Sequence, residues 1–409
     1  MKIIDIEAIP IHPRLASRYD NLAGRVRMSG IDCRMVFKVK TDNGIVGYGD
    51  YDWPGPPPPN SMFEPLIDRN PFDFLLNRLN MGLGSALYDV MGKYLEVPVY
   101  KLLGQKVRDA GTVAAWTRPC PPDVFAQEVK RSMDEGYMVF KMHTNARWDP
   151  VEQAKAAMDM NPPKGFKIHY DFNHGQRTVG TLMPLIEMLE RECPIVGFIE
   201  DPMMRSDVDG WRTLRQKSKI AIVHGGDPIM GGFQEILAGM ADAYMLVGST
   251  SIASIMAQGT LCARANVQTI LQLTGGTLMK AMTLHLAAVL PTATGHSINL
   301  DDQYEEDITT KRFEVTEGFS RVPEGSGLGF DVDEVAIKRM SQQEPLQPPK
   351  TVGILHLPGG KKIYSTRYPA VQRITGREEG DIRGINFQYW EDDGSPEFAK
   401  AYAEAEKTQ

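Results

Sequence analysis

Several short apolar runs of this sequence end in side chains that can do chemistry together. Lys141 and His143 stand at the end of one such run. Later runs, or the turns after them, end in three acids: Asp171, Glu200 and Asp227. Any one of these acids, taken alone, could cap a helix. Three carboxylates meeting at one place need a cation between them. Hard oxygen ligands favour Mg²⁺, with water and substrate oxygens completing an octahedron.

The pair Lys141 and His143 is suited to proton abstraction. One residue separates them, so on a strand both side chains point to the same face. Two neighbouring cationic groups lower each other's pKa, and a base poised near neutrality can remove a weakly acidic proton. We expect His143 to be the general base, with Lys141 as its electrostatic partner or as the alternative base. The plainer alternative is a solvated lysine beside a hydrogen-bonded loop histidine.

The elements that must position these residues repeat along the chain from residue 111. Short apolar runs alternate with helix-like segments, and the ends of the runs are spaced 22–29 residues apart. These ends fall near Trp116, His143, Asp171, Glu200, Asp227, Ser249, Gln272 and Asn299. A doubly wound open sheet would also alternate, but eight evenly spaced units favour a closed α/β barrel of the (β/α)8 type. The active site of such a barrel lies at the C-terminal ends of its strands.

The two ends of the chain do not show this alternation of apolar runs and helix-like segments. Residues 1–110 are predicted to form an α+β domain, with an Asn43-Gly44 hairpin signal and helical spacing over residues 72–103. Residues 111–325 would form the barrel. Residues 326–409 would return to the first domain and add an extension, because the strand–helix period stops near residue 340 and a Pro/Gln-rich stretch follows.

Composition excludes several classes of protein. The 409 residues carry 45 Lys plus Arg against 52 Asp plus Glu, a formal net charge of -7, without a basic stripe. That balance argues against nucleic acid or a membrane surface as partner. No apolar run reaches the roughly 18 residues of a membrane span, and Asp5 and Glu7 argue against a signal peptide. Four scattered cysteines without a CxxC pair indicate a reducing compartment. We expect a cytoplasmic enzyme.

The ordered motifs resemble those of a known family. Phe140-Lys141-Met142-His143 falls where the enolase superfamily, in its mandelate racemase/muconate lactonizing branch, has Lys-x-Lys. The Asp-x-Asn, Glu-Asp-Pro and Gly-Gly-acid motifs of that branch correspond to Tyr170-Asp171-Phe172-Asn173, Ile199-Glu200-Asp201-Pro202 and Gly225-Gly226-Asp227. The resemblance covers roughly residues 1–340. It implies a modified barrel with an N-terminal capping domain and a homo-oligomeric assembly. It also implies one Mg²⁺ held by the three acids and removal of a proton α to a carboxylate.

The sequence departs from the family at the second base. Members of the racemase group pair an Asp on the sixth strand with a His on the seventh, and these places are taken here by Ser249 or Thr250 and by Gln272. Neither side chain is an ordinary base. The lactonizing group's lysine on the sixth strand is absent as well. Racemisation needs an acid or base on each face of the substrate, whereas β-elimination can proceed with one. The sequence therefore favours a Mg²⁺-dependent hydro-lyase that dehydrates a sugar acid to a 2-keto-3-deoxy acid.

Five residues are candidates for binding this small carboxylic acid. Three of them, Asn173, Thr250 and Gln272, would contact hydroxyl groups. Arg18 and Tyr19 lie in a stretch that resembles the family's capping loop, together with Arg25 and Arg27, and could bind the distal end of the substrate. Two alternatives remain open. One is an epimerase, racemase or cycloisomerase with an unrecognised second base such as His174. The other is a metal-binding member without turnover.

Overall fold

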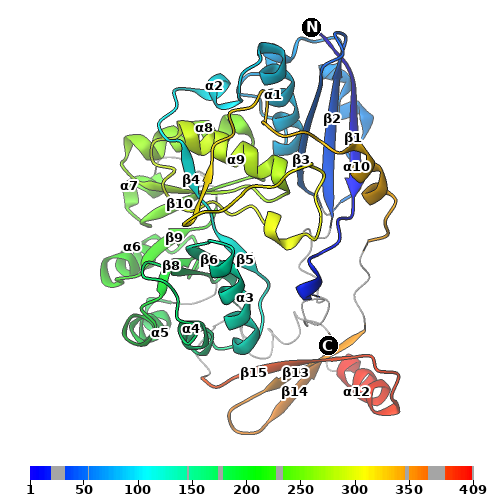
Figure 1. The fold of residues 1–409 in the computed structure, drawn as a ribbon. Coiled ribbons are helices and arrows are strands. Elements are labelled where there is room, and N and C mark those ends of the chain that lie inside the picture. Colours follow the sequence, from blue (N-terminus) through cyan, green and yellow to red (C-terminus); the bar gives the residue numbers. More distant parts are fainter. Residues whose placement is uncertain are drawn as a thin grey trace.

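The chain folds into three parts that follow one another along the long dimension of the molecule (Figure 1). The computed structural model describes residues 1–19, 33–53, 55–144, 147–173, 178–226, 234–345, 350–366 and 383–407. An antiparallel sheet with its helices lies at one end, a ring of parallel strands in the middle, and a small sheet with one helix at the other end. Within the described ranges, every helix is too short or too polar to cross a membrane.

The first part is built on the antiparallel strands β1 (Ile3–Ile11), β2 (Arg34–Thr41) and β3 (Val46–Asp52), in that order. The predicted hairpin joins β2 to β3, but only Gly44 of its turn takes positive φ, at 84°. Helix α1 (Met81–Leu95) packs on β3. A Cβ on Gly49 would lie 2.8 Å from the backbone nitrogen of Ala86, so glycine permits this close approach.

The expectation of helical structure over residues 72–103 holds only in pieces. A 3-10 turn at Pro71–Phe74 comes first, then α1, then the short α2 (Tyr100–Leu103). The Asn80 side chain accepts from Leu83 N and begins α1, while Glu96 ends it in the left-handed region (φ 55°). Pro98 then lacks the N–H that a continuing helix needs. Further 3-10 turns lie at Ser17–Tyr19, Asn60–Met62, Glu64–Leu66 and Asp301–Gln303.

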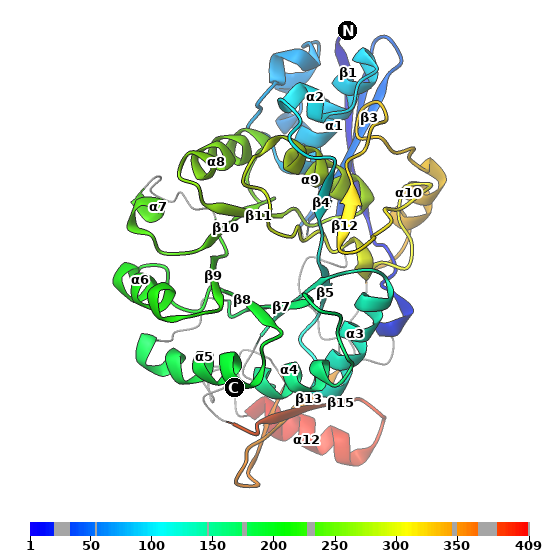
Figure 2. The same cartoon turned by 60° about the vertical axis from the view of Figure 1, so that its left-hand side comes forward.

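The middle part is a parallel sheet of seven strands in the order β11-β10-β9-β8-β7-β6-β5. They are β5 (Ala115–Thr117), β6 (Val139–His143), β7 (Lys167–Asp171), β8 (Val196–Glu200), β9 (Ala221–His224), β10 (Ala243–Val247) and β11 (Gln268–Gln272). The helices between and after them are α3 (Pro122–Asp134), α4 (Pro150–Met158), α5 (Val179–Glu192), α6 (Val208–Lys217), α7 (Gln234–Ala238), α8 (Ile252–Arg264) and α9 (Thr277–Val289). Figure 2 shows the helices from α3 to α8 outside the curved sheet.

The eighth unit closes the ring without forming a regular strand. Ser297 bridges to Val113 and Ile298 bridges to Gln272, both in parallel orientation. Ala114 N donates to Ser297 O and Ile298 N to Leu271 O, each at 2.9 Å. The predicted (β/α)8 architecture is therefore confirmed, with its eighth strand reduced to two bridges. The predicted ends of β6, β7, β8 and β11 coincide with the observed ones, whereas β9 ends at His224, before the predicted Asp227.

A buried ion cluster fastens the N-terminal sheet to the barrel. Arg34 of β2 is fully buried, and its Nε donates to Asp50 Oδ2 (2.8 Å) while its Nη1 donates to Asp307 Oδ1 (3.0 Å). The two acids in turn accept the first backbone N–H groups of α9: Gly276 N donates to Asp50 and Thr277 N to Asp307. The cluster thus joins three segments that are far apart in the sequence.

Replacing Arg34 by Met is expected to destabilise the protein by about 3–5 kcal/mol, because it leaves two carboxylates buried without their cation. Chemical denaturation measures this loss. Arg69→Met is the matched control, since its pair with Asp73 is exposed on both sides and should contribute less than about 1 kcal/mol. A loss for Arg34→Met no larger than that of the control would contradict the assignment.

Helix α9 lies between the N-terminal sheet and the barrel, and all of its residues are buried. His285 is one of them; its Nε2 is 3.4 Å from Leu328 O. Burial lowers the pKa of His285 to about 3, against about 6.5 for an exposed histidine. Between these two values the unfolded chain binds a proton that the folded chain does not. The folded state therefore loses stability as the pH falls from 6.5 towards 3.

His285→Gln removes this titration, so its stability should fall less steeply in acid than that of the wild type. The difference in slope should reach about 1.4 kcal/mol per pH unit, the value for one proton. Urea unfolding at pH 7, 5.5 and 4 measures it. Parallel stability curves for the two proteins would show that His285 binds its proton in the folded state as well.

Between the barrel and the third part, the chain returns towards the N-terminal part. Strand β12 (Phe319–Arg321) pairs with β4 (Ala110–Thr112), and α10 (Glu334–Ser341) packs on β1. The remaining strands form a separate antiparallel sheet in the order β14-β13-β15, from β13 (Thr351–His356), β14 (Lys362–Ser365) and β15 (Asn386–Glu391). Helix α12 (Pro396–Lys407) covers one face of that sheet. The sheet lies on the side of the barrel that is away from β1–β3 (Figure 1).

Candidate active site

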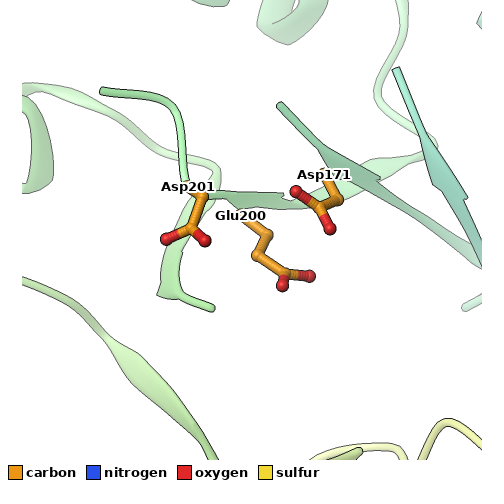
Figure 3. Close-up of side chains that lie close together, drawn as sticks. All are labelled: Asp171, Glu200 and Asp201. Atoms are coloured by element: carbon orange, nitrogen blue, oxygen red, sulfur yellow. The ribbon is translucent and has the colours of Figure 1, made fainter. Parts of the chain in front are cut away.

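Two of the predicted metal ligands stand side by side at the ends of neighbouring strands. Asp171 ends β7, Glu200 ends β8, and the two residues pair in register. Asp201 follows directly, and one carboxylate oxygen from each of these three acids lies within 4.8 Å of the other two. All three residues are buried, and Figure 3 shows their side chains gathered below the strand ends. The described residues thus contain a compact acidic cluster at the predicted place.

Lys141 of β6 lies against two members of this cluster, Asp171 and Glu200. Its Nζ is 2.6 Å from Glu200 Oε2 and 3.3 Å from Asp171 Oδ2, and it donates to Gln272 Oε1 at 3.0 Å. The side chain is fully buried. Burial alone would lower the pKa of Lys141, but the charges of Glu200 and Asp171 outweigh it and raise that pKa. Lys141 is therefore a buried cation rather than a neutral amine.

His143, two residues further along β6, lies nearer to the surface of the site. Its Nε2 is 3.4 Å from Asp171 Oδ2, and its Nδ1 is 3.1 Å from Asn173 Oδ1. The ring meets Trp116 edge to face, with the ring centres 5.9 Å apart. The side chain is 22% exposed. Of the two predicted bases, His143 is the one that solvent or a substrate can reach.

The two acids carry unequal affinities for a proton. Burial alone would raise the pKa of Asp171. The charges of His143 and Lys141 and the N–H of Asn173 have the larger combined effect and lower this pKa to about 2. Burial and the neighbouring charge of Asp171 raise the pKa of Glu200 to about 8, against the opposing effect of Lys141. One lysine thus does not balance two buried carboxylates. The site favours additional positive charge, which a divalent cation would supply.

The donor set fits a divalent metal ion. Glu200 Oε2 is buried and has no well-aligned hydrogen-bond donor among the described residues, although Lys141 Nζ and His169 Nε2 lie nearby. Asp201 is already engaged, since its Oδ1 accepts from Gly225 N (2.9 Å) and its Oδ2 pairs with Arg205 (2.9 Å). Asp171 and Glu200 are therefore the better placed ligands. Asp227, the third predicted ligand, lies outside the described residues and stays a prediction.

Three features of the site were missed from the sequence. Asp201 completes the acidic cluster. His169 Nε2 lies 2.9 Å from Glu200 Oε2, and His296 Nε2 lies 2.7 Å from His169 Nδ1. The position of His169, two residues before Asp171 on the same strand, is a signal that it faces the barrel interior. No local pattern marks His296, which reaches His169 only through the closure of the barrel.

The predicted substrate contacts divide into two groups. Asn173 and Gln272 lie in the site, bonded to His143 and Lys141. Thr250 follows β10, and its hydroxyl donates to Val247 O (2.8 Å). The capping-loop candidates are engaged elsewhere: Arg18 pairs with Glu128 (3.2 Å) and donates to Asp302 O (2.6 Å), while the Tyr19 hydroxyl bonds to Gln303. Arg25, Arg27 and His174 lie outside the described residues. The roles of all these side chains in substrate binding stay predictions.

Comparison with known proteins identifies the family. A family model described as "Enolase C-terminal domain-like" matches residues 124–336, which is more than half of the chain. The chain belongs to the mandelate racemase/muconate lactonizing branch of the enolase superfamily. Members of this superfamily are enzymes that bind a divalent metal, and this chain has a buried acidic cluster of Asp171, Glu200 and Asp201.

The relatives of this enolase-superfamily member differ in activity. D-galactonate dehydratase of Variovorax paradoxus is 25% identical over 76% of this chain and 92% of its own. N-succinyl-L-Arg/Lys racemase of Bacillus cereus is 24% identical over 46% of this chain and 57% of its own. The crystal structure of that racemase has a TM-score of 0.69 over 84% of this chain, at 19% identity and covering 99% of the racemase chain. Muconate lactonizing enzyme of Pseudomonas putida reaches 0.67 over 83% of this chain, at 20% identity and covering 99% of the matched chain. The structural matches establish the fold alone.

Proposed function

We propose that the protein is a Mg²⁺-dependent dehydratase of a sugar acid. It would remove the proton α to the carboxylate and eliminate the β-hydroxyl, giving a 2-keto-3-deoxy acid. Two relatives, named D-galactonate dehydratase and D-gluconate dehydratase, support this reaction, each at 25% identity. The proposed substrate is accordingly a small polyhydroxy carboxylic acid.

The observation that carries the proposal is that the candidate bases lie on one side of the site only. Lys141 and His143 project together from β6, whereas the end of β11, where a racemase would need its second base, presents Gln272. The amide of Gln272 cannot take up a proton, and its Oε1 already accepts from Lys141 Nζ. Racemisation requires an acid or base on both faces of the substrate. Elimination requires one base and a leaving hydroxyl.

In the proposed reaction His143 Nε2 takes the α-proton, and the electrons of the C–H bond move into the carboxylate group to give an enediolate. These electrons then form the double bond to the β-carbon and expel the hydroxyl, which takes the proton from His143 and leaves as water, and the enol product tautomerises to the keto acid. The Lys141 ammonium stabilises the negative charge that develops on the substrate carboxylate. Asp171 and Glu200, completed by Asp227, would hold the Mg²⁺. When bound, Mg²⁺ would neutralise part of the charge on the enediolate oxygens.

A second candidate activity is racemisation or epimerisation. It is favoured by the similarity to N-succinyl-L-Arg/Lys racemase, which lies over less than half of this chain. This activity would require a base from the residues outside the described ranges.

The two activities are separated by one experiment in D₂O with Mg²⁺. The purified protein is incubated with a library of sugar acids that includes D-galactonate and D-gluconate, and with N-succinyl amino acids. Appearance of a 2-keto-3-deoxy acid from any sugar acid supports the dehydratase. Deuterium at the α-carbon of an unchanged or inverted acid, without keto product, would replace it by the racemase. Inertness towards every acid would overturn both.

A further inference from the structure

A pair of histidines lies behind Glu200 in the interior of the barrel. His169 comes from β7 and is fully buried, and His296, from the segment that closes the ring, is 2% exposed. The two rings meet edge to face with centres 4.9 Å apart, and His296 meets Phe198 of β8 at the same distance. Phe198 and Glu200 project to the same side of β8, because they are two residues apart. The histidine pair is thus packed directly beneath a proposed metal ligand.

Close polar contacts connect the two histidines to Glu200. His169 Nε2 lies 2.9 Å from Glu200 Oε2, although the two atoms are not aligned as a hydrogen bond. On the other side of the ring, His169 Nδ1 is hydrogen-bonded to His296 Nε2 at 2.7 Å. A neutral imidazole has one donor and one acceptor, so one ring nitrogen of each histidine is used in this bond. His296 therefore holds the His169 ring in its place against Glu200.

We propose that His169 and His296 are positioning residues that hold the Glu200 carboxylate in place for the metal: His296 is hydrogen-bonded to His169, and His169 makes a close polar contact with Glu200. The inference rests on the proposed metal site and deepens it. It explains why two polar rings lie inside the barrel, where apolar side chains would have a lower free-energy cost of burial. Removal of an outer partner of a metal ligand commonly weakens metal binding about 10–100-fold.

The test compares His296 variants that keep or lose the group hydrogen-bonded to His169. His296→Gln retains an amide that can hydrogen-bond on a side chain of similar reach, whereas His296→Leu and His296→Met remove the polar group with two different shapes. Mg²⁺ alone is titrated into the metal-free protein by calorimetry, and thermal unfolding is measured alongside. We expect the affinity to fall about tenfold or more in the Leu and Met variants, with recovery to within about threefold in the Gln variant.

Each other outcome has a distinct meaning. If Gln, Leu and Met all bind Mg²⁺ like the wild type, the positioning role is overturned and the metal site stands. Equal losses in all three variants would show that His296 acts only by packing, which also overturns the inference. If the wild type binds no Mg²⁺, the proposed metal site itself fails, and the positioning role fails with it.

A different observation concerns the C-terminal extension, residues 350–407. Its sheet has α12 on one face, and the other face meets the chain just after β6, at residues 147–152 (Figures 1 and 2). Trp148 is 3% exposed, its Nε1 donates to Phe387 O (3.2 Å), and its ring pairs with Phe387 at 5.9 Å. Arg383 Nε lies 3.0 Å from Asp149 Oδ2. Asp149 is the residue that caps α4.

The same short loop is attached to the active site at its other end. Thr144, next to His143, donates to Asp171 O from both its backbone nitrogen (2.7 Å) and its hydroxyl (3.0 Å). Thr144 is therefore tied to a proposed metal ligand, and Trp148 and Asp149, a few residues further along the chain, are tied to the extension. Residues that are already held in place have few conformations to lose when substrate binds.

The two solved structures compared above leave part of this chain unmatched. The chains of the racemase and of the muconate lactonizing enzyme are each covered to 99%, yet only 83–84% of this chain is matched. The family model ends at residue 336, before the extension begins. We further infer that the extension is a positioning element for this reaction, which holds the loop after β6 at Trp148 and Asp149, through the contacts of Phe387 with Trp148 and of Arg383 with Asp149. Only the expected effect of the extension on catalysis rests on the proposed function; its contacts with Trp148 and Asp149 do not.

Arg383→Gln and Trp148→Phe weaken these contacts, and Phe398→Leu is the matched control. Phe398 is buried on the α12 face of the same sheet, against Trp390 and Tyr402. Hydrogen–deuterium exchange of the loop amides is measured in each full-length variant, together with kcat and KM on an acid that the wild type turns over. We expect about tenfold faster exchange in the loop and a several-fold lower kcat at nearly unchanged KM in the first two variants, but not in the control.

Unchanged loop exchange in both Arg383→Gln and Trp148→Phe would overturn the inference. An equal effect of Phe398→Leu would also overturn it, because the extension would then act through general stability. If the wild type turns over no acid, the proposed function fails separately, and the exchange measurement still decides whether the extension holds the loop. Faster exchange at unchanged kcat would leave the extension as a structural brace and remove its positioning role.

Discussion

Glu200→Gln is expected to weaken Mg²⁺ binding by more than about 100-fold, beyond what loss of an outer-shell partner costs, and to abolish α-proton abstraction. Glu200 and Asp171 are the two buried carboxylates that face each other across neighbouring strand ends, with Lys141 between them. The amide keeps the shape of the side chain but removes its charge. Calorimetry with Mg²⁺ and exchange of the α-proton in D₂O measure the two effects independently.

Asp201→Asn is the matched comparison for this prediction. Asp201 belongs to the same cluster, but its oxygens are held by Gly225 N and Arg205. We therefore expect Asp201→Asn to bind Mg²⁺ better than Glu200→Gln, and Asp227→Asn to resemble Glu200→Gln. If Asp201→Asn loses the metal while Asp227→Asn retains it, the third ligand is Asp201 and the assignment of Asp227 is wrong.

The second large effect concerns the two candidate bases, which the structure separates by environment. His143→Asn is expected to lower the rate of α-proton exchange by about 10²–10⁴-fold, the usual contribution of a general base, with Mg²⁺ affinity nearly unchanged. The reason is that His143 is partly exposed and contacts Asp171 only at 3.4 Å. The exchange rate and a Mg²⁺ titration of the same variant check this expectation.

Lys141→Met should behave differently from His143→Asn. The Lys141 ammonium lies against both carboxylates and competes with a metal ion for them. Its removal should therefore abolish activity while Mg²⁺ binds as tightly as before or more tightly. If Lys141→Met keeps full exchange activity, the lysine has no part in the reaction. If His143→Asn keeps it and Lys141→Met loses it, the base is Lys141.

The barrel, and the strand ends that carry the candidate site residues, follow from the local pattern of the sequence. In a parallel barrel the strands are buried on both faces and the loops after them carry the polar groups, so each apolar run that ends in a charged residue marks one strand end. That reasoning located the ends of β6, β7 and β8, and with them Lys141, His143, Asp171 and Glu200. The same reasoning failed where backbone geometry intervenes, as at Glu96 and Pro98, which interrupt the predicted helical stretch.

Tertiary structure alone decided which of these groups touch. Lys141 reaches Gln272, 131 residues away, and His169 reaches His296, 127 residues away, because the ring of strands closes and brings both pairs into the same interior. Arg18 and Tyr19 turn towards Glu128 and Gln303 because the capping segment lies against α3 and the last barrel loop. The spacing of apolar residues and the composition of the sequence indicate whether a residue is buried and where it lies along a strand. They carry no information on partners that only chain closure places nearby, such as Gln272 for Lys141 and His296 for His169.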